Sequence, residues 1–185
     1  MKIFYDTEFF ECGPKHPIRF ISLGAVRDDG NELYLITNNL YTLNRANQNP
    51  WLAENVIKHL PVKQGQDGRL AWDIQHPDYA RVLPNEVIAG LWRDFVLDYD
   101  AEYEFDKPEL WAYYGAYDHV VISQLFGRMI DLPDGHPMYT MDIKQRWYNE
   151  GKPGLPEQEG DAHRALDDAR WNKLAYEYLD EYANR

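Results

Sequence analysis

The sequence predicts one α/β domain, residues 1–185, built on a mixed β-sheet flanked by α-helices. Three β-strand patterns come first, and helical and strand patterns then alternate along the rest of the chain. The chain has 185 residues, of which 44% are hydrophobic, and this is enough to form a hydrophobic core. No internal repeat, low-complexity tract or linker divides the sequence, so we expect one domain.

The three N-terminal strands are predicted at residues 2–10, 18–28 and 32–37. Residues 2–10 read KIFYDTEFF, with aromatic and β-branched residues around two acids. Asp28, Asp29 and Gly30 separate the second and third strands and are typical of a hairpin turn. A calcium loop also begins with such acids, but the ligand spacing that should follow is missing.

Helical patterns occupy much of the remaining chain. Asn49 suits the N-cap of a helix, Pro50 its first position, and Pro61 its end. Residues 61–83 show little periodicity and are predicted to be a loop. The other predicted elements are a helix at 83–99, a strand at 109–115, a helix at 117–129, a strand at 138–143, a helix ending near 151, a loop at 151–160 and a helix at about 162–182.

Composition narrows the functional classes. The net charge of -12 argues against broad electrostatic binding to phosphate backbones. A single cysteine, Cys12, excludes an internal disulfide and fits a reducing compartment. The N-terminal residues show no apolar signal region, and no apolar run approaches the ~20 residues that cross a bilayer. We therefore expect a soluble, cytoplasmic protein without a membrane partner.

Two acids in the first strand are unusual for a core strand. Side chains alternate along a strand, so Asp6 and Glu8 share a face with Phe4 and Phe10. An isolated buried carboxylate is costly, and two neighbouring carboxylates raise each other's pKa. The pattern therefore requires a group that compensates these acids.

Two further acids fall on predicted apolar helix faces. Asp118 lies at the centre of the stripe formed by Val121, Ile122, Leu125 and Met129. Asp168 lies in the middle of the face formed by Ala165, Trp171, Ala175, Tyr178, Leu179 and Tyr182. Its neighbour Asp167 is predicted at the edge of the polar side, with Arg170 and Glu181. Asp168 is therefore the anomalous acid of this pair.

Each acid alone also has a structural interpretation. Asp118 is a suitable helix cap, and Asp168 has the chemistry to pair with a core arginine or tyrosine. One divalent site compensates all four acids together, and Mg²⁺ and Mn²⁺ prefer carboxylate oxygens. His163 precedes Asp168 by five residues and is either structural or, beside such a site, a general base.

These residues, in this order, resemble the motifs of the DEDDh branch of the DnaQ-like 3'-5' exonucleases. Asp6-Thr7-Glu8 matches the first motif, Asp118 the second, and the run HRALDDA, containing His163 and Asp168, the third. The resemblance implies a ribonuclease H-like fold. The stretches DTEFFECG, NPWLAENVIKHLP and PELWAYYGAYDHVVISQLFG are more closely similar to the polyadenylate-specific exoribonuclease AS family, over nearly the whole chain.

One departure from the broader DnaQ-like pattern is visible. Many relatives carry a His-Asn pair shortly before the second-motif aspartate, where this chain has YYGAYD. The difference concerns contacts near the scissile phosphate rather than the metal ligands, and it favours the exoribonuclease AS subgroup over DNA proofreading relatives.

The resemblance implies a specific chemistry. Single-stranded RNA, in particular an adenylate-rich 3' tail, is shortened from its 3' end to nucleoside 5'-monophosphates, with two Mg²⁺ or Mn²⁺ ions per active site. Asp6, Glu8 and Asp168 are the ligands expected for one ion, and Asp6 with Asp118 contributes to the second. His163 is the expected general base. The family also implies a homodimer.

Substrate contacts are expected from residues beside the motifs. Base stacking on aromatic rings binds single strands without requiring positive charge. The residues concerned, for which core packing is the alternative, are Phe9, Trp111, Tyr114 and Tyr117. Phe9 points away from the acids if its strand is regular. Thr7 is included through its place between two ligands.

Other functions remain open at this point. A DNA 3'-5' exonuclease has the same residues, and degradation of matched RNA and DNA strands separates the two. A catalytically silent nucleotide-binding scaffold binds without turnover, although the presence of all five catalytic residues counts against it. An acidic, metal-binding structural domain is the third class.

Overall fold

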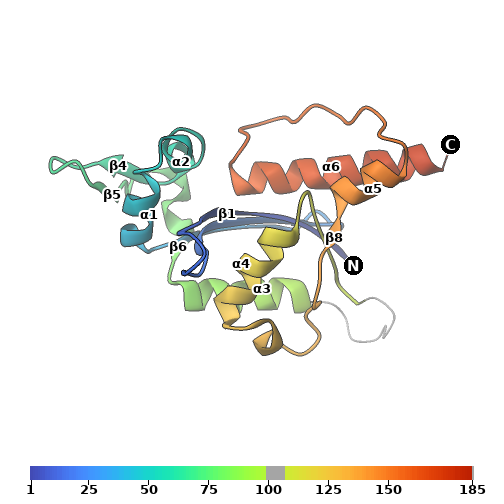
Figure 1. The fold of residues 1–185 in the computed structure, drawn as a ribbon, viewed down its shortest axis with the longest axis horizontal. Coiled ribbons are helices and arrows are strands. Elements are labelled where there is room, and N and C mark those ends of the chain that lie inside the picture. The colour runs from blue at the N-terminus through green and yellow to red at the C-terminus, as the bar shows by residue number, and fades with distance from the viewer. Residues whose placement is uncertain (99–106, 185) are drawn as a thin grey trace.

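A mixed sheet of six strands forms the centre of the fold in the computed structural model, which describes residues 1–98 and 107–184 (Figure 1). The strand order is β6-β3-β2-β1-β7-β8, and β1 pairs antiparallel with β2 and parallel with β7. The strands are β1 (Lys2–Phe10), β2 (Arg19–Arg27), β3 (Glu32–Thr37), β6 (Val82–Leu83), β7 (Glu109–Ala112) and β8 (Met141–Asp142). This confirms the predicted α/β class and is consistent with a ribonuclease H-like fold.

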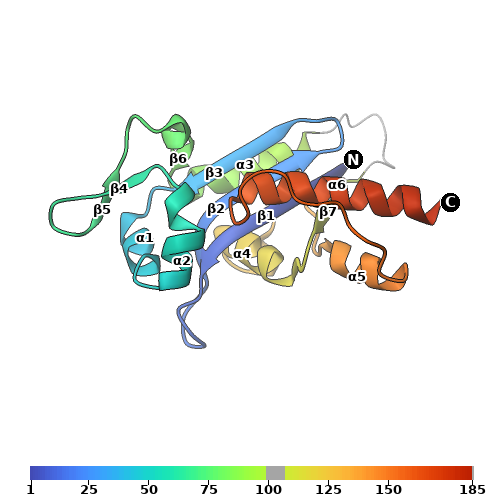
Figure 2. The same ribbon diagram turned by 90° about the horizontal axis from the view of Figure 1, so that it is seen from above.

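Helices cover both faces of the sheet, with α5 and α6 on one face and α3 and α4 on the other (Figures 1 and 2). The helices are α1 (Leu40–Ala46), α2 (Pro50–Asn55), α3 (Asn85–Leu97), α4 (Ala116–Phe126), α5 (Ile143–Asn149) and α6 (Ala165–Ala183). Short 3₁₀ turns are η1 (Ile57–His59), η2 (Pro77–Arg81) and η3 (Met129–Asp131). Within the described ranges, no helix combines the length and the apolar character that crossing a membrane requires.

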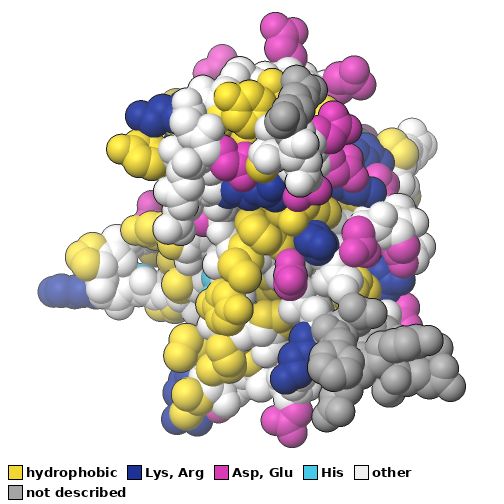
Figure 3. All heavy atoms as spheres, turned by 90° about the vertical axis from the view of Figure 1, so that its right-hand side faces the viewer, with side chains coloured by type: hydrophobic (Ala, Val, Ile, Leu, Met, Phe, Trp, Pro, Cys, Tyr) yellow, Lys and Arg dark blue, Asp and Glu magenta, His cyan; other side chains and the backbone are white. Residues whose placement is uncertain are grey.

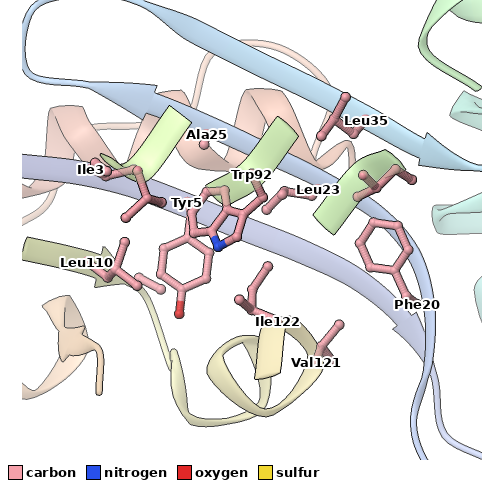
Figure 4. Packing of buried hydrophobic residues seen from close by; sticks show 13 residues of the cluster. Ile3, Tyr5, Phe20, Leu23, Ala25, Leu35, Trp92, Leu110, Val121 and Ile122 are labelled. Atoms are coloured by element: carbon pink, nitrogen blue, oxygen red, sulfur yellow. The ribbon is translucent and has the colours of Figure 1, made fainter. Parts of the chain in front are cut away.

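The alternation in β1 sets the two faces of the core. Ile3 and Tyr5 pack with Trp92 of α3 and Ile122 of α4 (Figure 4). Phe4, one position away, packs instead with α5 and α6. Asp6 has the same parity as Phe4 and therefore faces α6, as the strand pattern predicted.

The prediction that residues 61–83 form a loop was wrong. This segment contains the hairpin of β4 (Val62–Gln64) and β5 (Leu70–Trp72), followed by η2 and β6. Helix α1 was also not predicted; the side chain of Asn39 caps it by accepting a hydrogen bond from the backbone N–H of Thr42. All of these elements have seven residues or fewer, too few to show a reliable period.

Several helices and strands begin or end at residues other than the predicted ones. The helix predicted at 83–99 begins after Pro84 and ends at Leu97, and residue 99 lies outside the described ranges. The strand predicted at 109–115 ends at Ala112, because Tyr114 has a positive φ of 61° that a strand does not tolerate. Helix α4 ends before Gly127, which leaves Met129 in η3. β8 and α6 are shorter at their starts than predicted.

The buried face of α6 differs from the predicted one. Tyr182 is 41% exposed, whereas Leu166, Ala169 and Asn172 are buried. The N-terminal half of the helix crosses β1 and β2, so that two sides of it are covered there. The buried amide of Asn172 is satisfied because it donates to the backbone carbonyl of Tyr5 at 2.9 Å.

Gly24 allows α6 to approach the sheet closely. A Cβ atom at this position of β2 would lie 2.2 Å from the backbone of Ala165 and 2.3 Å from that of Leu166. Neither backbone can move aside as the end of a flexible side chain would. In the β1–β2 ladder Gly24 is the partner of Asp6, so the closest point between helix and sheet lies next to the first acid.

We expect Gly24→Ala to destabilise the protein by about 3 kcal/mol or more, because overpacking against two backbones cannot be relieved by a rotamer change. Urea denaturation followed by circular dichroism measures this. Gly90→Ala is the matched control: Gly90 lies inside α3 with nothing within 4 Å of a new Cβ, so stability should be unchanged or higher by up to ~1 kcal/mol. Equal stability of the two variants would contradict the close contact.

Candidate active site

A cavity of about 550 Å³ opens where the C-terminal part of β1, the β7–α4 connection and the start of α6 meet. All five residues predicted to be catalytic line it: Asp6, Glu8, Asp118, His163 and Asp168. The other lining residues are Thr7, Phe9, Glu11, Tyr113, Tyr114, Tyr117, Gln158, Trp171 and Asn172. The fold therefore brings together side chains from three separate parts of the sequence.

The first strand contributes two acids side by side. Asp6 and Glu8 pair with Gly24 and Ser22 of β2, and the register shifts immediately after Glu8. This irregularity interrupts the ladder beside the cavity, and pairing resumes with Phe9 opposite Phe20 and Phe10 opposite Arg19. Glu8 is buried and Asp6 is half-buried.

Asp118 comes from the first turn of α4 and is bonded to β1. Its Oδ1 accepts hydrogen bonds from the backbone N–H of Thr7 at 2.8 Å and from the Thr7 hydroxyl at 2.7 Å. The cap of α4 is Gly115, so the interpretation of Asp118 as a helix cap was wrong. The bond instead joins the helix layer to the strand between the two β1 acids.

Asp168 lies in the first turn of α6 and faces Glu8. Its Oδ1 accepts a hydrogen bond from the Gln158 amide at 2.7 Å. The sequence suggested a core arginine or a tyrosine hydroxyl as a structural partner of Asp168. In the structure its partner is instead the neutral amide of Gln158, from the preceding loop. Asp167, in contrast, is buried and paired with Arg164 at 3.2 Å and Arg170 at 2.8 Å. Its predicted place on the polar side was wrong, although its charge is compensated.

His163 completes the cluster from the loop before α6. Ligand atoms of Glu8, His163 and Asp168 all lie within 4.8 Å of one another. The backbone of His163 has a φ of 66°, which is rare for a residue other than glycine. The ring of Trp51 packs edge-on against the imidazole, with the ring centres 4.9 Å apart.

An ionic network fixes the helix immediately after His163. Arg164 bonds to Asp78 of η2 at 3.0 Å, and its guanidinium lies over the ring of Tyr34, 4.7 Å from the ring centre. Arg170, one and a half turns later, pairs with Glu32 of β3 at 2.6 Å. These contacts hold the start of α6 in place while His163 and Asp168 remain beside the cavity.

Burial and like charge raise the pKa of every acid in the cluster. For Asp6 the causes are burial first, then the charges of Asp118, Glu8 and Asp168, and its pKa lies well above the ordinary value. Burial, with Asp168 and Asp118, raises the pKa of Glu8 to about 9. Burial raises the pKa of Asp118 to about 6 against the opposing hydrogen bonds from Thr7. Burial raises the pKa of Asp168, and the Gln158 bond partly offsets the shift.

The donor set suits a hard divalent cation. The four clustered carboxylates, the Glu11 carboxylate and one imidazole line the cavity, and no lysine or arginine is among the described residues that line it. Mg²⁺ and Mn²⁺ prefer such oxygen donors, and a bound cation reverses the electrostatic effect that raises these pKa values.

The predicted substrate residues divide into two groups. Phe9 and Tyr117 stack with ring centres 5.9 Å apart, and both line the cavity with Tyr114, which is 63% exposed. Phe9 packs on the α3/α4 face of the sheet, as the alternation along β1 predicts. It still borders the cavity, because the start of α4 lies beside it there. Trp111 does not line the cavity; its indole bonds to Glu109 and packs on Tyr176.

Thr7 has a defined role in the structure. Its hydroxyl proton is donated to Asp118, so the side chain positions an acid and is not free to donate to a substrate hydroxyl. Sequence reasoning did not identify Gln158, Trp51 or Asn172. Gln158 lies in a loop and Trp51 is exposed on a short helix, so no hydrophobic periodicity marks either of them.

Comparison with known proteins agrees with this geometry. Residues 1–179 match the family model described as a 3'-5' exoribonuclease Rv2179c-like domain. The 3'-5' exoribonuclease Rv2179c of Mycobacterium tuberculosis strain ATCC 25618 / H37Rv is 36% identical over 170 residues, which cover 92% of this chain and 88% of the relative. The 3'-5' exoribonuclease MT2234.1 of strain CDC 1551 / Oshkosh matches with the same identity and coverage.

We expect Glu8→Gln to stabilise the metal-free protein at pH 8. The folded state raises the pKa of Glu8 from 4.5 to about 9, so the folded state binds more protons and its stability falls as pH rises between these values. Removing this carboxylate should therefore raise the free energy of unfolding at pH 8, by more than about 1 kcal/mol, which corresponds to one pKa unit. At pH 4 the effect should disappear.

Denaturation in EDTA at several pH values measures this effect. Glu11→Gln is the control, because Glu11 lines the same cavity but is exposed and should show little change. A Glu8→Gln protein that is less stable than the wild type at pH 8 would mean that groups of the chain itself compensate this charge.

Proposed function

The chain belongs to the Rv2179c-like family of 3'-5' exoribonuclease domains, and from that premise we propose that the acidic cavity hydrolyses single-stranded RNA with two divalent cations, preferring adenylate-rich 3' ends. Membership of this family makes the protein a 3'-5' exoribonuclease. The observation that carries the finer proposal is the convergence of Asp6, Glu8, Asp118, Asp168 and His163 on one cavity.

The four acids are the proposed metal ligands. Asp6, Glu8 and Asp168 would hold one Mg²⁺ or Mn²⁺ ion, and Asp6 with Asp118 would contribute to the second. Such ions supply a water of lowered pKa and stabilise the charge that develops on the phosphate and on the leaving 3'-oxygen. Thr7 supports this arrangement by holding Oδ1 of Asp118, and Gln158 does the same for Asp168.

His163 is the proposed general base. Its imidazole lies within the cluster formed with Glu8 and Asp168, and it is half-buried, which leaves it access to water. It takes the proton of the attacking water while the water oxygen bonds to phosphorus and the bond from phosphorus to the 3'-oxygen breaks. The products are a nucleoside 5'-monophosphate and an RNA shortened by one nucleotide. Trp51 restricts the ring orientation from one side.

The aromatic border of the cavity is the proposed site of the terminal bases. The stacked Phe9–Tyr117 pair and the exposed Tyr114 offer flat apolar faces beside the acids. Stacking contributes about 1–3 kcal/mol per base without positive charge, which suits a cavity without lysine or arginine among its described lining residues. Adenine has a large π-surface, and the family resemblance supports the adenylate preference.

We expect His163→Ala to lower the rate of RNA shortening by roughly 10²- to 10⁴-fold, the usual contribution of a general base. Asp168→Asn should abolish shortening, and EDTA should abolish it in the wild type. The assay follows a 5'-labelled RNA ending in adenylates, with Mg²⁺ or Mn²⁺, on a sequencing gel. His16→Ala is the control, since His16 is exposed in the β1–β2 connection and does not line the cavity.

Three matched strands separate the proposed substrate from the alternatives. An A-tailed RNA should be shortened faster than an RNA of mixed sequence, and both faster than the matched DNA. Faster degradation of the DNA would identify a DNA exonuclease. Binding of all strands without shortening in either metal would identify a silent nucleotide-binding scaffold.

We also propose that the protein forms a homodimer. Figure 3 shows hydrophobic side chains gathered from the centre to the lower left of the face on the right of Figure 1, with charged side chains mainly above and to the right of them. Large apolar side chains are exposed on α6, where Leu174 is 42% exposed and Tyr182 41% exposed. Burial of such side chains between two copies would support association. Light scattering after size-exclusion chromatography should give twice the monomer mass of 21.8 kDa.

A further inference from the structure

A lysine on α5 is held among aromatic rings at the border of the active-site cavity. Lys144 Nζ lies 3.6 Å from the ring centre of Trp147, 5.3 Å from that of Tyr113 and 5.6 Å from that of Tyr114. It also donates a hydrogen bond to the Tyr113 hydroxyl at 3.0 Å. These contacts fix the ammonium group in one place, with Tyr113 accepting one of its three protons.

Among the described residues, no acid forms an ion pair with this lysine. Most arginines of the described chain pair with acids, for example Arg146 on the same helix with Glu150 and Asp180. The ion pairs found among the described residues include neither Lys144 nor Lys152. The chain has a net charge of -12, so two lysines on one short segment, both outside the ion pairs of the described residues, form a local exception to its acidic character.

The lysine is connected to the active-site cavity through two tyrosines. Tyr113 and Tyr114 line the active-site cavity and also contact Lys144. The other borders of the cavity are acidic or neutral: Glu11 lines it on the β1 side, and the exposed Glu157 and Glu159 flank Gln158 on the loop before α6. Among these described borders, the protein's own charges repel a polyanion on the Glu11 and Glu157–Glu159 sides and attract it toward Lys144.

A second cation extends the same surface outward. Lys152 Nζ lies 4.3 Å from the ring centre of Tyr148, which is 62% exposed. The backbone N–H of Lys152 donates to the carbonyl of Trp147 at 3.0 Å, so this second pair is attached to the first. The surface formed by Tyr114, Lys144, Tyr148 and Lys152 thus alternates aromatic rings and ammonium groups. Single-stranded nucleic acids bind such surfaces through base stacking and phosphate contacts.

We propose that this α5 surface binds the RNA strand on the 5' side of the scissile bond, with Lys144 contacting a backbone phosphate and Lys152 a phosphate farther along. The inference rests on the proposed function of the cavity. It explains how an acidic protein retains a polyanionic substrate: lysines lie at one border of the cavity, and the acids near Glu11 and Gln158 disfavour phosphates at the other borders.

The test compares Lys144→Gln with the wild type on two substrates. A ten-nucleotide oligoadenylate spans the α5 surface, whereas the dinucleotide ApA carries only the scissile phosphate. We expect KM for the decamer to rise roughly 10- to 100-fold, as expected for the loss of one charged hydrogen bond, with little change in kcat. For ApA, kcat/KM should be unchanged. Lys144→Arg, which keeps the charge, should retain most of the decamer affinity.

Two further variants serve as controls. Lys63→Gln removes the same charge from the β4–β5 hairpin, which lies at the end of the molecule opposite α5, and should leave both substrates unaffected (Figure 2). Lys152→Gln alters an exposed side chain, so it should fold normally and show a smaller rise in KM for the decamer. An unchanged decamer KM in Lys144→Gln would overturn the proposal. Equal losses on both substrates would also overturn it, because they indicate a structural role.

Binding measurements separate this proposal from the proposed function. In a His163→Ala background, fluorescence anisotropy with labelled decamer in Mg²⁺ gives the dependence of affinity on salt. Lys144→Gln should weaken binding and reduce the slope of log K against log salt by about 0.7, the value for one phosphate contact on a single strand. Wild-type protein that cleaves no RNA would refute the proposed function. An unchanged salt slope would refute only the α5 surface.

Discussion

The contact between the start of α6 and the middle of β2 at Gly24 is the constraint on which the rest of the site depends. Because no Cβ separates them, the backbone of Ala165 lies against the strand, and Asp168, one turn later, comes to face the acids of β1. Gly24 is the ladder partner of Asp6, so the closest approach coincides with the first acid. The Arg164–Asp78 and Arg170–Glu32 pairs then prevent the helix from rotating away.

The fold keeps four like charges close together by placing them where two hydrophobic layers meet. Clusters around Tyr5 and Trp92 on one face of the sheet, and around Ile21 and Leu43 on the other, supply the favourable burial. Thr7 joins the layers by bonding to Asp118 from the strand that carries the other two acids. The electrostatic consequence is that the pKa values of these acids are raised. In the proposed function a divalent cation would compensate these acids, and the stability lost by keeping them together would serve its binding.

Charge is distributed unevenly around this site. The protein as a whole is strongly acidic, and the ion pairs around α6 use arginines to fix the helix rather than to attract a ligand. The α5 segment differs, because its lysines are held by aromatic rings instead of acids. In the proposed arrangement, cations bound by the acids would meet the scissile phosphate and the lysines would meet the strand behind it. A protein of net negative charge does not need a broad basic surface for this.

The sequence by itself determined the fold class and which acids are anomalous. A period of two in β1 places Asp6 and Glu8 on the face opposite Ile3 and Tyr5. The structure keeps this alternation because helices cover both faces of the sheet. The helical period likewise selected Asp118 and Asp168. The short elements α1, β4 and β5 could not be predicted, since tertiary contacts rather than a long repeated pattern stabilise them.

Only the tertiary structure decided how these residues meet and what surrounds them. The hydrogen bond from Thr7 to Asp118 joins residues 111 positions apart in the sequence, and no local sequence pattern extends over that separation. The Gln158 bond to Asp168 and the ring of Trp51 against His163 likewise depend on how loops and helices pack together. Periodicity reports which side of an element is apolar, whereas the partner of a buried polar group is fixed by the elements packed against it.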